Sequence, residues 1–593
     1  MCDGAIRAEK SALTAPFFSV ILTHMNHICE ELHRCESHKG VDLPAVDILI
    51  VGGGVNGLAV AREAQVRGWS ATVVEADDIG AGTSGTSSRL VHGGVRYLEN
   101  LEFHLVRESL KERERLLFTA PHLVQPYPLL IPFYKHNRRH GFVLRLGMVL
   151  YDVLSFDKST PLHRTFSKTR VQQAYPGLDS KDLYGAALYY DAQAANTERL
   201  CVEQALDIVA LGGSVRNHTR VTGLTEQASG ISVSMFDSLT ETHYTQTAAI
   251  VVNAAGPWVD RVLGLSKTAS SQLIGGTKGS HLTVGPFPGA PSTGVHFEAT
   301  SDGRAILVLP LPDGNYLVGA TDIFFEGDPG SAVMSDEEID YLISEVNRLV
   351  PAAHLLRSDV LHTVSGVRPL PFSPKAKSAA QVSRSHHLVA HPAMSGLFSI
   401  TGGKLTTHRA LGEMAINKLQ SRPAVPGAPG RRRLLSQLFN PSASTRRLKL
   451  PGARSSDLTR FTSSFRRTTS LPAASIDRLL GLYGVRVERL EQLVASRPEL
   501  AATLPGRDDA IAAEVVMAVQ DEFARTLTDI VARRLLLVWN DDAGLDSLDG
   551  VAAVAAQELG WDQTHIDREI ASYRDWIRLR RPAAYEPDAS IAR

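Results

Sequence analysis

The stretch Asp47-Ile-Leu-Ile-Val-Gly-Gly-Gly-Val-Asn-Gly57 decides the fold, because it joins a buried apolar run directly to a G-x-G-x-x-G turn. A helical pattern follows as far as Arg67, and a second apolar run, Ala71–Val74, ends at Glu75. The glycine turn alone would also fit other α/β units. An acidic residue about 20 positions after such a strand, turn and helix is typical of a dinucleotide-binding βαβ unit.

Each residue of this motif has an expected task. Gly52 permits the tight turn, Gly54 lets the backbone approach a pyrophosphate, and Gly57 lets helix and strand pack closely. The N-terminus of the helix offers amide N–H groups and the positive end of its dipole to the phosphates. Glu75 is expected to accept hydrogen bonds from the ribose hydroxyls.

Two distant segments favour FAD over NAD as the dinucleotide. Ile250–Gly256 and Phe398–Lys404 both read as buried strands that end in small residues, namely Ala255, Gly256, Gly402 and Gly403. A nicotinamide domain is normally complete within about 150 residues and needs no such late segments. In two-domain flavoproteins these strands return to the first sheet, and their small residues let the backbone approach the flavin.

Bulk properties exclude several classes of protein. The chain has 593 residues and a formal net charge of −1, which points to two or three domains and gives no reason to expect nucleic acid as a partner. Its 4 cysteines do not make a disulfide framework and favour a reducing compartment. The segment Phe142–Leu154 is too short for a membrane span, and a buried or interfacial helix is expected there.

Residues 1–45 are expected to form an N-terminal extension that resembles neither a secretory signal nor a good transit peptide. It contains His27, Cys29, His33, Cys35 and His38, but these lack the paired short spacing of a zinc finger. A helical or disordered tail is therefore preferred to a metal site. No metal is expected in the protein.

The rest of the chain divides by composition. Residues 46–420 are expected to hold an FAD domain (segments 46–120, 195–265 and 360–420) interleaved with a β-rich substrate domain (121–194 and 266–359). Residues 421–468 are rich in Arg, Pro and Ser and read as a linker. Residues 469–593 read as an all-α domain, in which Thr526–Leu537 is one of the expected helices.

Several segments together resemble the FAD-dependent glycerol-3-phosphate dehydrogenases of the aerobic, quinone-linked type. The resemblance extends over about residues 46–540 and is carried by Thr83–Glu99, Lys278–His281, Gly319–Asp322, Gly327–Pro329, Ser365–Leu370, Gly402–Thr407, Asp521–Ala524 and Ala532–Arg534. The first 45 residues have no counterpart in the family, and the Arg-rich stretch 420–468 is longer than usual. The resemblance implies a Rossmann-type FAD domain, an antiparallel-sheet substrate domain and a helical C-terminal cap.

The reaction implied is oxidation of sn-glycerol 3-phosphate at C2 to dihydroxyacetone phosphate, with hydride transfer to flavin N5. A dianionic phosphate requires two or more cations, ideally arginines. By resemblance, Arg368 and Arg384 bind the phosphate. The other expected substrate contacts are Lys404, Arg96, Tyr97 and Thr321, and Arg368 and Lys404 also count among the catalytic residues.

His281 is the leading candidate for the base that takes the hydroxyl proton, because imidazole accepts protons near neutral pH. His92 is the alternative, although its place in the flavin signature indicates contact with the cofactor. The remaining cofactor contacts implied are Gly94 and three serines, Ser84, Ser87 and Ser88. The serines are either turn formers or donors to the flavin diphosphate, and the second interpretation is favoured.

The electron acceptor is left open between a quinone and O₂, and the pattern fits the quinone-linked dehydrogenases better. A quinone implies peripheral contact with the inner face of the cell membrane from the cytoplasm, through the apolar 142–154 stretch or the arginines of 431–467. A solvated linker explains those arginines equally well. A homodimer is also compatible with the resemblance. The competing hypotheses are a flavin oxidase, acting on the same phosphate or on an amine, and a regulatory flavin-binding protein without turnover.

Overall fold

A computed structural model describes residues 40–95, 102–138, 141–266, 271–374, 382, 385–420 and 444–582. Three of the expected substrate contacts, Arg96, Tyr97 and Arg384, lie outside the described residues. The five histidines and cysteines considered for zinc, and Arg431–Arg433 of the expected linker, also lie outside them.

The first sheet, sheet A, is built around the strand that precedes the glycine turn. Residues Ile48–Val51 of this strand are buried, as expected for the centre of a parallel sheet. The strand order is β17-β18-β10-β1-β2-β7, and the hairpin of β8 and β9 extends β10 on its antiparallel side. The bounds are β1 (Val41–Val51), β2 (Ala71–Val74), β7 (Ser214–Arg216), β8 (Thr219–Gln227), β9 (Gly230–Asp237), β10 (Thr242–Asn253), β17 (His387–Ala390) and β18 (Leu397–Thr401).

Three helices cover one face of sheet A. They are α2 (Val55–Val66), α6 (Thr197–Ala210) and α9 (His408–Gln420), and they share a buried core with the sheet that includes Ile48, Leu58, Val202 and Leu411. The short helix α7 (Val259–Gly264) contributes Val259 and Leu263 to a separate core that includes residues of β8 and β9. As expected, β10 and β18 return to this sheet, β10 beside β1 and β18 beside β10.

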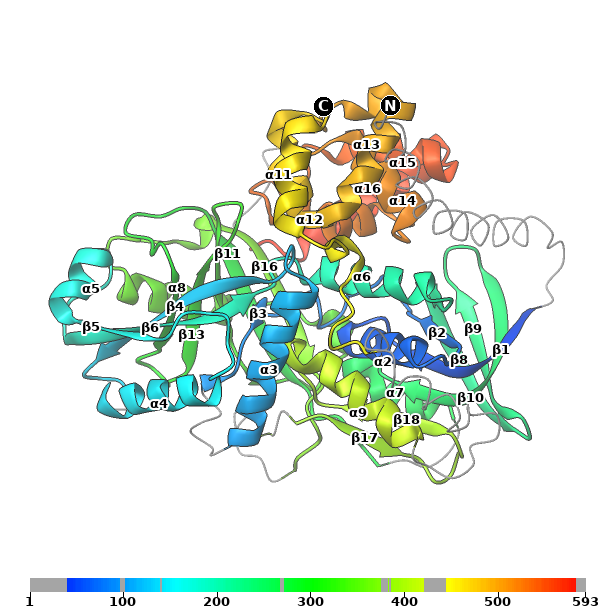
Figure 1. Cartoon of the computed structure of the whole chain (residues 1–593), viewed down its shortest axis with the longest axis horizontal. Coiled ribbons are helices and arrows are strands. Elements are labelled where there is room, and N and C mark those ends of the chain that lie inside the picture. The colour runs from blue at the N-terminus through cyan, green and yellow to red at the C-terminus, as the bar shows by residue number, and fades with distance from the viewer. Residues whose placement is uncertain are drawn as a thin grey trace, which may run out of the picture.

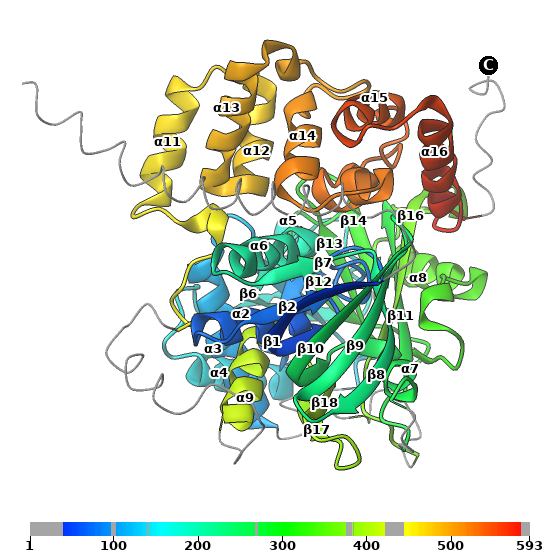
Figure 2. The ribbon, with the colours of Figure 1, turned by 90° about the vertical axis from the view of Figure 1, so that its right-hand side faces the viewer.

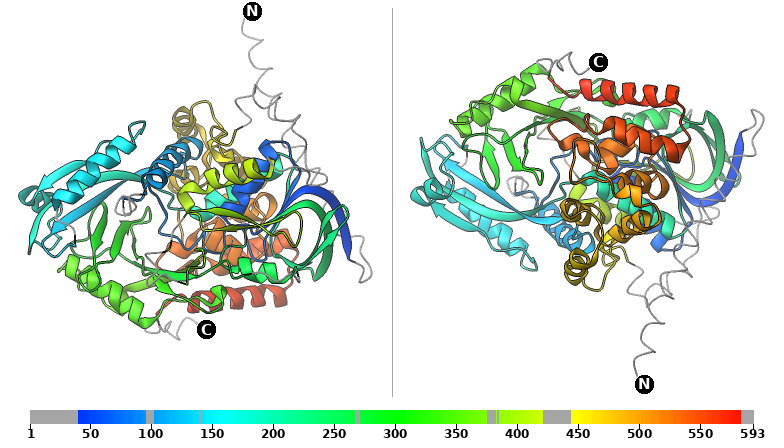
Figure 3. Two further views of the ribbon diagram at one scale, coloured as in Figure 1. Left: turned by 90° about the horizontal axis from the view of Figure 1, so that it is seen from below. Right: turned by 90° about the horizontal axis from the view of Figure 1, so that it is seen from above.

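The second sheet, sheet B, lies beside sheet A along the long axis of the molecule (Figures 1 and 3). Its order is β15-β11-β14-β13-β12-β4-β6-β3, with β16 on β11 and β5 on β6, and its pairs are antiparallel except β12 with β4. The bounds are β3 (Leu90–Val91), β4 (Gln125–Tyr134), β5 (Arg164–Ser167), β6 (Leu183–Gln193), β11 (Thr277–Val284), β12 (Gly294–Glu298), β13 (Ala305–Pro310), β14 (Tyr316–Gly319), β15 (Ile323–Phe324) and β16 (Val360–Arg368).

Four helices accompany sheet B: α3 (Phe103–Thr119), α4 (Gly141–Leu154), α5 (Lys168–Ala174) and α8 (Asp336–Leu349). Helix α8 begins with a capping box between Ser335 and Glu338 and packs its apolar face into the core of the sheet. Helix α4 buries Met148 and Tyr151 but leaves its other face exposed. Among the described helices, none combines the length and apolarity that crossing a bilayer requires.

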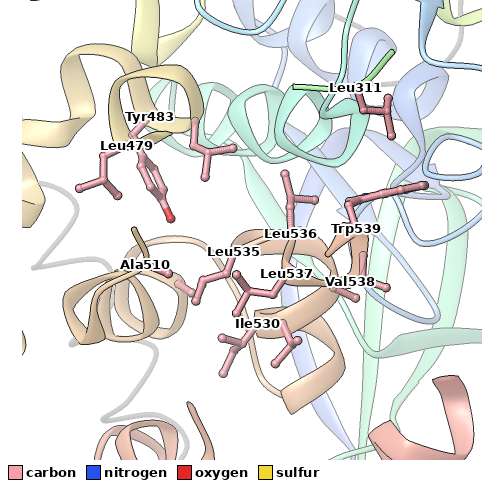
Figure 4. Close-up of a cluster of buried hydrophobic side chains, with 14 of the residues drawn as sticks. Leu311, Leu479, Tyr483, Ala510, Ile530, Leu535, Leu536, Leu537, Val538 and Trp539 are labelled. Atoms are coloured by element: carbon pink, nitrogen blue, oxygen red, sulfur yellow. The ribbon is translucent and has the colours of Figure 1, made fainter. Parts of the chain in front are cut away.

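The C-terminal helical domain (residues 444–582), here called the cap, lies over both sheets (Figure 2). Its α-helices are α11 (Leu458–Thr468), α12 (Ile476–Tyr483), α13 (Val487–Ser496), α14 (Ala512–Asp521), α15 (Leu548–Leu559) and α16 (Gln563–Arg578). Leu479, Tyr483, Ile530 and Leu535 lie in its buried core, which continues through Trp539 toward Leu311 of the substrate domain (Figure 4).

The fold class expected from the sequence is confirmed, and four local expectations change. Strand β1 begins at Val41, inside the expected extension, and α11 lies inside the expected linker. Strand β16 belongs to sheet B because it pairs along β11, although 360–420 was expected to be an FAD segment. The expected helix Thr526–Leu537 is a π-helix, η11 (Asp529–Arg534), that ends before Leu536, whose backbone is left-handed (φ 60°).

Candidate active site

One cavity of about 1420 Å³ runs between the two sheets and reaches the cap. Gly52 and Glu75 line one end, and His281 and Arg368 line another part. Ordinary ligand pockets measure roughly 300–1,000 Å³, so this cavity has room for a long cofactor together with a small substrate.

The glycine turn closes around the carboxylate of Glu75. The N–H of Gly53 donates to Glu75 Oε2 at 2.6 Å, which fixes this side chain beside the turn. A Cβ atom at Gly57 would lie 2.0 Å from the carbonyl oxygen of Gly52, so helix α2 can approach the strand only with glycine there. At the start of α2, the N–H of Val55 donates to Ser84 Oγ at 3.0 Å.

The late glycine segment meets the turn from the other side. Gly402 N donates to the carbonyl oxygen of Pro369 at 2.8 Å, which places the Gly402–Lys404 loop next to Arg368. Gly403 has a φ of 98° and packs against Asn56, whose Oδ1 is buried without a hydrogen-bond partner. An open phosphate-binding turn, an orphaned polar atom and a long cavity are what the diphosphate and flavin of FAD require, so these residues fit FAD.

The loop that follows β3 is held against this glycine segment. His92 N donates to Thr406 Oγ1 at 3.0 Å, and Gly93 N donates to the hydroxyl of Tyr151 at 3.0 Å. His92 and Gly94 line the cavity, as do Ala255 and Gly256 from the end of β10.

Arg368 lies at the end of β16 with its guanidinium across Gly279 of the neighbouring strand. A Cβ atom at Gly279 would lie 2.0 Å from Arg368 Nη2, so a larger residue there would displace the guanidinium from this position. Arg368 donates to Asp322 Oδ1 at 2.8 Å and to the carbonyl oxygen of Thr321 at 3.1 Å. Arg304 Nη1 lies 3.7 Å from Asp322 Oδ2, so Asp322 stands between two arginines that line the cavity.

His281 lies on β11, directly opposite Val364 of β16. Its Nε2 is 2.9 Å from Ser88 Oγ, and its Nδ1 is buried without a partner. Burial, followed by the nearby charges of Arg368 and Arg89, lowers the pKa of His281 to about 3. The imidazole is therefore neutral at physiological pH in this state.

A buried carboxylate, Glu338, connects the strands beneath the site. Its Oε1 accepts hydrogen bonds from Thr321 Oγ1 at 2.6 Å and from Ser280 Oγ at 2.9 Å. Its Oε2 lies 2.7 Å from Lys278 Nζ. Burial raises the pKa of Glu338, but the hydrogen bonds from Lys278 and Thr321 outweigh that effect and lower it.

Several expected site residues also have partners within the protein. The hydroxyl of Thr321, expected to contact substrate, is engaged by Glu338. Ser88, expected at the flavin diphosphate, pairs with His281, and Ser87 accepts a hydrogen bond from Arg89 N at 3.2 Å, as a turn-forming serine does. Lys404 lines the cavity, and its Nζ donates to Ser109 Oγ at 3.1 Å.

Sequence reasoning did not single out several residues that line the cavity. Arg304 precedes β13 in a turn, where an arginine is unremarkable without its neighbours in space. His296 and His362 lie on strands of sheet B, and the cap adds Trp539, Trp576 and Arg580. No local motif marks these positions, because only the packing of distant segments brings them together.

Comparison with known proteins identifies the family. Residues 47–415 match the family model of FAD-dependent oxidoreductases, and residues 443–566 match the model of the C-terminal domain of alpha-glycerophosphate oxidase. A glycerol-3-phosphate dehydrogenase of Synechocystis sp. is 40% identical over 550 residues, which cover 90% of this chain and 96% of that protein. The chain belongs to the FAD-dependent glycerol-3-phosphate dehydrogenase family. FAD is accordingly its cofactor.

Other members of the family resemble the chain over most of its length. Glycerol-3-phosphate dehydrogenase 2 of Mycobacterium tuberculosis is 32% identical over 94% of this chain and 92% of its own. D-erythritol 1-phosphate dehydrogenase of Brucella abortus is 34% identical over 82% of this chain and 93% of its own. The glycerol-3-phosphate dehydrogenase of Bacillus halodurans, solved with FAD, has the same fold, with a TM-score of 0.72 at 24% identity over 92% of this chain and 97% of that one.

Proposed function

We propose that this enzyme oxidises the C2 hydroxyl of sn-glycerol 3-phosphate to dihydroxyacetone phosphate. The observation that carries the proposal is the meeting of His281 and Arg368 on one face of sheet B, beside the Gly402–Lys404 loop. A proton acceptor and a phosphate-binding cation are what this oxidation requires next to a flavin. The close relationship to glycerol-3-phosphate dehydrogenases supports the same substrate.

FAD, held by the glycine turn and the Gly402–Lys404 loop, would supply a two-electron acceptor for this oxidation. His281 receives the hydroxyl proton as the C2–O bond becomes a carbonyl. Its neutral imidazole is ready to accept, but its low pKa makes it a weak base without substrate. A dianionic phosphate beside Arg368 would offset the charge of that arginine, which after burial is the next cause of the low pKa of His281. His92 remains the alternative base.

Arg368 binds the phosphate, and Arg304 offers a further cation beside it, because both arginines flank Asp322. A phosphate can take over hydrogen bonds that these arginines now share with Asp322. Lys404 approaches the substrate from the flavin loop. Arg384, Arg96 and Tyr97 complete the proposed substrate site.

The proposed electron acceptor is a quinone, reached by peripheral attachment to a membrane. The exposed face of α4 supports this, because it presents a row of apolar side chains that a soluble surface rarely carries. Their exposed fractions are 70% for Phe142, 61% for Leu146 and 60% for Val153. In the described part of the arginine-rich stretch, Arg446 and Arg466 pair with Glu413 and Asp477.

Steady-state assays with a short-chain quinone, and with O₂ alone, test the substrate and the acceptor. We expect rapid quinone reduction with sn-glycerol 3-phosphate and little hydrogen peroxide under air. A higher kcat/KM for D-erythritol 1-phosphate than for sn-glycerol 3-phosphate would contradict the proposed substrate. Stoichiometric hydrogen peroxide would contradict the proposed quinone acceptor and identify the enzyme as an oxidase.

Sedimentation with phospholipid vesicles tests the role of α4. We expect Leu146→Glu to weaken vesicle binding, because a charge on the docking face must be dehydrated. Leu356→Glu is the matched control, since Leu356 is 65% exposed on a different element. Equal vesicle binding by both variants would remove α4 from the membrane contact.

A further inference from the structure

Two loops form the end of the cavity that contains Glu75, the acidic residue expected to bind the ribose. One follows β2 (residues 75–78), and the other joins β7 to β8 (residues 216–219). Backbone hydrogen bonds join them: Glu75 N to Arg216 O at 2.8 Å, Thr219 N to Glu75 O at 2.8 Å, and His218 N to Asp77 O at 2.7 Å. Glu75 and Thr219 line the cavity. Since the acid after the second strand binds ribose in this type of unit, these loops hold the adenosine end of FAD.

The cap binds the first of these loops through hydrogen bonds to Asp78. Arg533 Nε donates to Asp78 Oδ2 at 2.7 Å, and Arg534 donates to both oxygens of Asp78 at 2.7 and 2.8 Å. Asn217 Nδ2, from the second loop, donates to Asp78 Oδ1 at 3.0 Å and to the carbonyl oxygen of Phe523 in the cap at 2.8 Å. Asp78, Asn217 and Arg534 are buried, so these bonds are shielded from water.

The cap grips the second loop through His218. His218 Nε2 lies 2.8 Å from Asp529 Oδ2, and Arg533 also donates to Asp529 Oδ1 at 2.7 Å. Burial raises the pKa of Asp529, but His218 and Arg533 outweigh that effect and lower it strongly. Arg533 therefore bridges two charged carboxylates, one in the cap and one in the FAD domain.

Asp78, His218 and Asp529 also lie close enough together to be considered as metal ligands. Arg533 and Arg534 already occupy the oxygens of Asp78, and Arg525 N, Thr526 N and Arg533 bind Asp529. A further cation would have to displace guanidinium groups from both carboxylates. The cluster is thus an interdomain lock and not a metal site.

The cap residues of the lock, Asp529, Arg533 and Arg534, lie on η11. Ile530 of η11 packs with Leu535 in the buried core of the cap (Figure 4). Ala532 and Arg533 line the cavity itself. Movement of the cap would therefore pull directly on the two adenosine loops.

We propose that the cap segment Phe523–Arg534 holds the adenosine end of the FAD site in its binding shape, so that cap docking and FAD retention are coupled. The coupling is reciprocal by linkage: FAD strengthens docking of the cap as much as docking strengthens FAD binding. The role concerns the cofactor alone and does not depend on the identity of the substrate.

The rate of FAD release from the purified holoenzyme, followed by flavin fluorescence, tests this. We expect Arg533→Gln to raise that rate by about tenfold or more, which is about 1.4 kcal/mol. Arg497→Gln is the matched control, since Arg497 pairs with Glu558 at 2.7 Å and both residues belong to the cap. We expect that variant to release FAD at the wild-type rate. Equal rates for the two variants would overturn the proposal.

Two further measurements keep the test decisive if Arg533→Gln does not fold. Asn217→Ala removes only the bridge between Asp78 and Phe523, and we expect a smaller rise in FAD release from it. Hydrogen exchange of residues 523–534 in the full-length wild-type protein should slow when FAD is added to the apoprotein. The coupling would be overturned if the exchange rate of these residues were the same with and without FAD. It would also be overturned if Asn217→Ala released FAD at the wild-type rate.

Discussion

Arg368 connects the chemistry of the site to the backbone around it. Its guanidinium needs the empty space above Gly279, and its partner Thr321 is fixed by Glu338, so its direction is set by residues on three elements. We expect Arg368→Ala to raise KM for sn-glycerol 3-phosphate by roughly 10- to 150-fold, because a charge-assisted contact is worth about 1.5–3 kcal/mol. Steady-state kinetics on the flavin-loaded variant provides the measurement.

Arg357→Ala is the control for this substitution. Arg357 also pairs with carboxylates, Asp336 and Asp340, but on the surface. An equal rise of KM in both variants would mean that Arg368 acts only through general stability.

At the residue scale, the sequence predicts what the local backbone dictates. The turn from Gly52 to Gly57 can be predicted because a Cβ atom at either of these two positions would collide with backbone. The pair of Ser88 and His281 is not readable, because 193 residues separate them and no local rule joins a serine to a histidine on another strand. The same holds for Arg304, whose relation to Asp322 exists only in the folded sheet.

At the scale of single elements, helix α4 has two faces with different roles. Its exposed face carries the apolar row, while its buried Tyr151 donates to Asp191 Oδ1 at 2.6 Å and accepts from Gly93 N at 3.0 Å. Tyr151 therefore supports the loop that carries His92 and Gly94. We expect Tyr151→Phe to lower kcat several-fold and the free energy of unfolding by about 1–3 kcal/mol, because Gly93 loses one of its acceptors.

Tyr184→Phe separates support of the loop from stability alone. The hydroxyl of Tyr184 accepts from Gly141 N at 2.6 Å, a comparable bond at the far end of α4. Denaturant unfolding and flavin reduction are measured for both variants. If Tyr184→Phe lowers kcat as much as Tyr151→Phe, the hydrogen bond to Gly93 has no special role.

Elements are predictable where their periodicity is strong and local. The glycine-turn βαβ unit follows from pattern alone. Helix α11 was missed because arginine, serine and threonine mask its single buried aromatic, Phe465. Strand β16 was assigned to the other domain because its sheet is decided by pairing with β11, at the far side of a long insertion.

At the scale of the whole molecule, buried ion pairs join the cap to the FAD domain. Arg199 Nη2 of α6 donates to Glu522 Oε1 of the cap at 2.7 Å, and Arg486 Nη1 lies 2.7 Å from the same oxygen. Burial raises the pKa of Glu522, but these two arginines outweigh it and lower the pKa from 4.5 to about 2. A lowered carboxyl pKa stabilises the fold above the unfolded value, and this contribution is lost as pH falls from about 4.5 to about 2.

The acid-dependent loss assigned to Glu522 is on the order of 3 kcal/mol. We therefore expect Glu522→Gln to lower the thermal unfolding temperature much more at neutral pH than near pH 3. Glu499→Gln is the control, because Glu499 is 70% exposed and lies 4.0 Å from Arg497. An equal effect of Glu522→Gln at both pH values would contradict the assignment.

Whether this cavity oxidises glycerol phosphate is tested most directly by anaerobic flavin reduction. Purified holoenzyme is mixed with sn-glycerol 3-phosphate, and the visible absorbance of oxidised flavin is followed. We expect full bleaching by this substrate and none by glycerol, which lacks the phosphate that Arg368 binds. A flavin that stays oxidised with sn-glycerol 3-phosphate, in protein that retains its FAD, would contradict it.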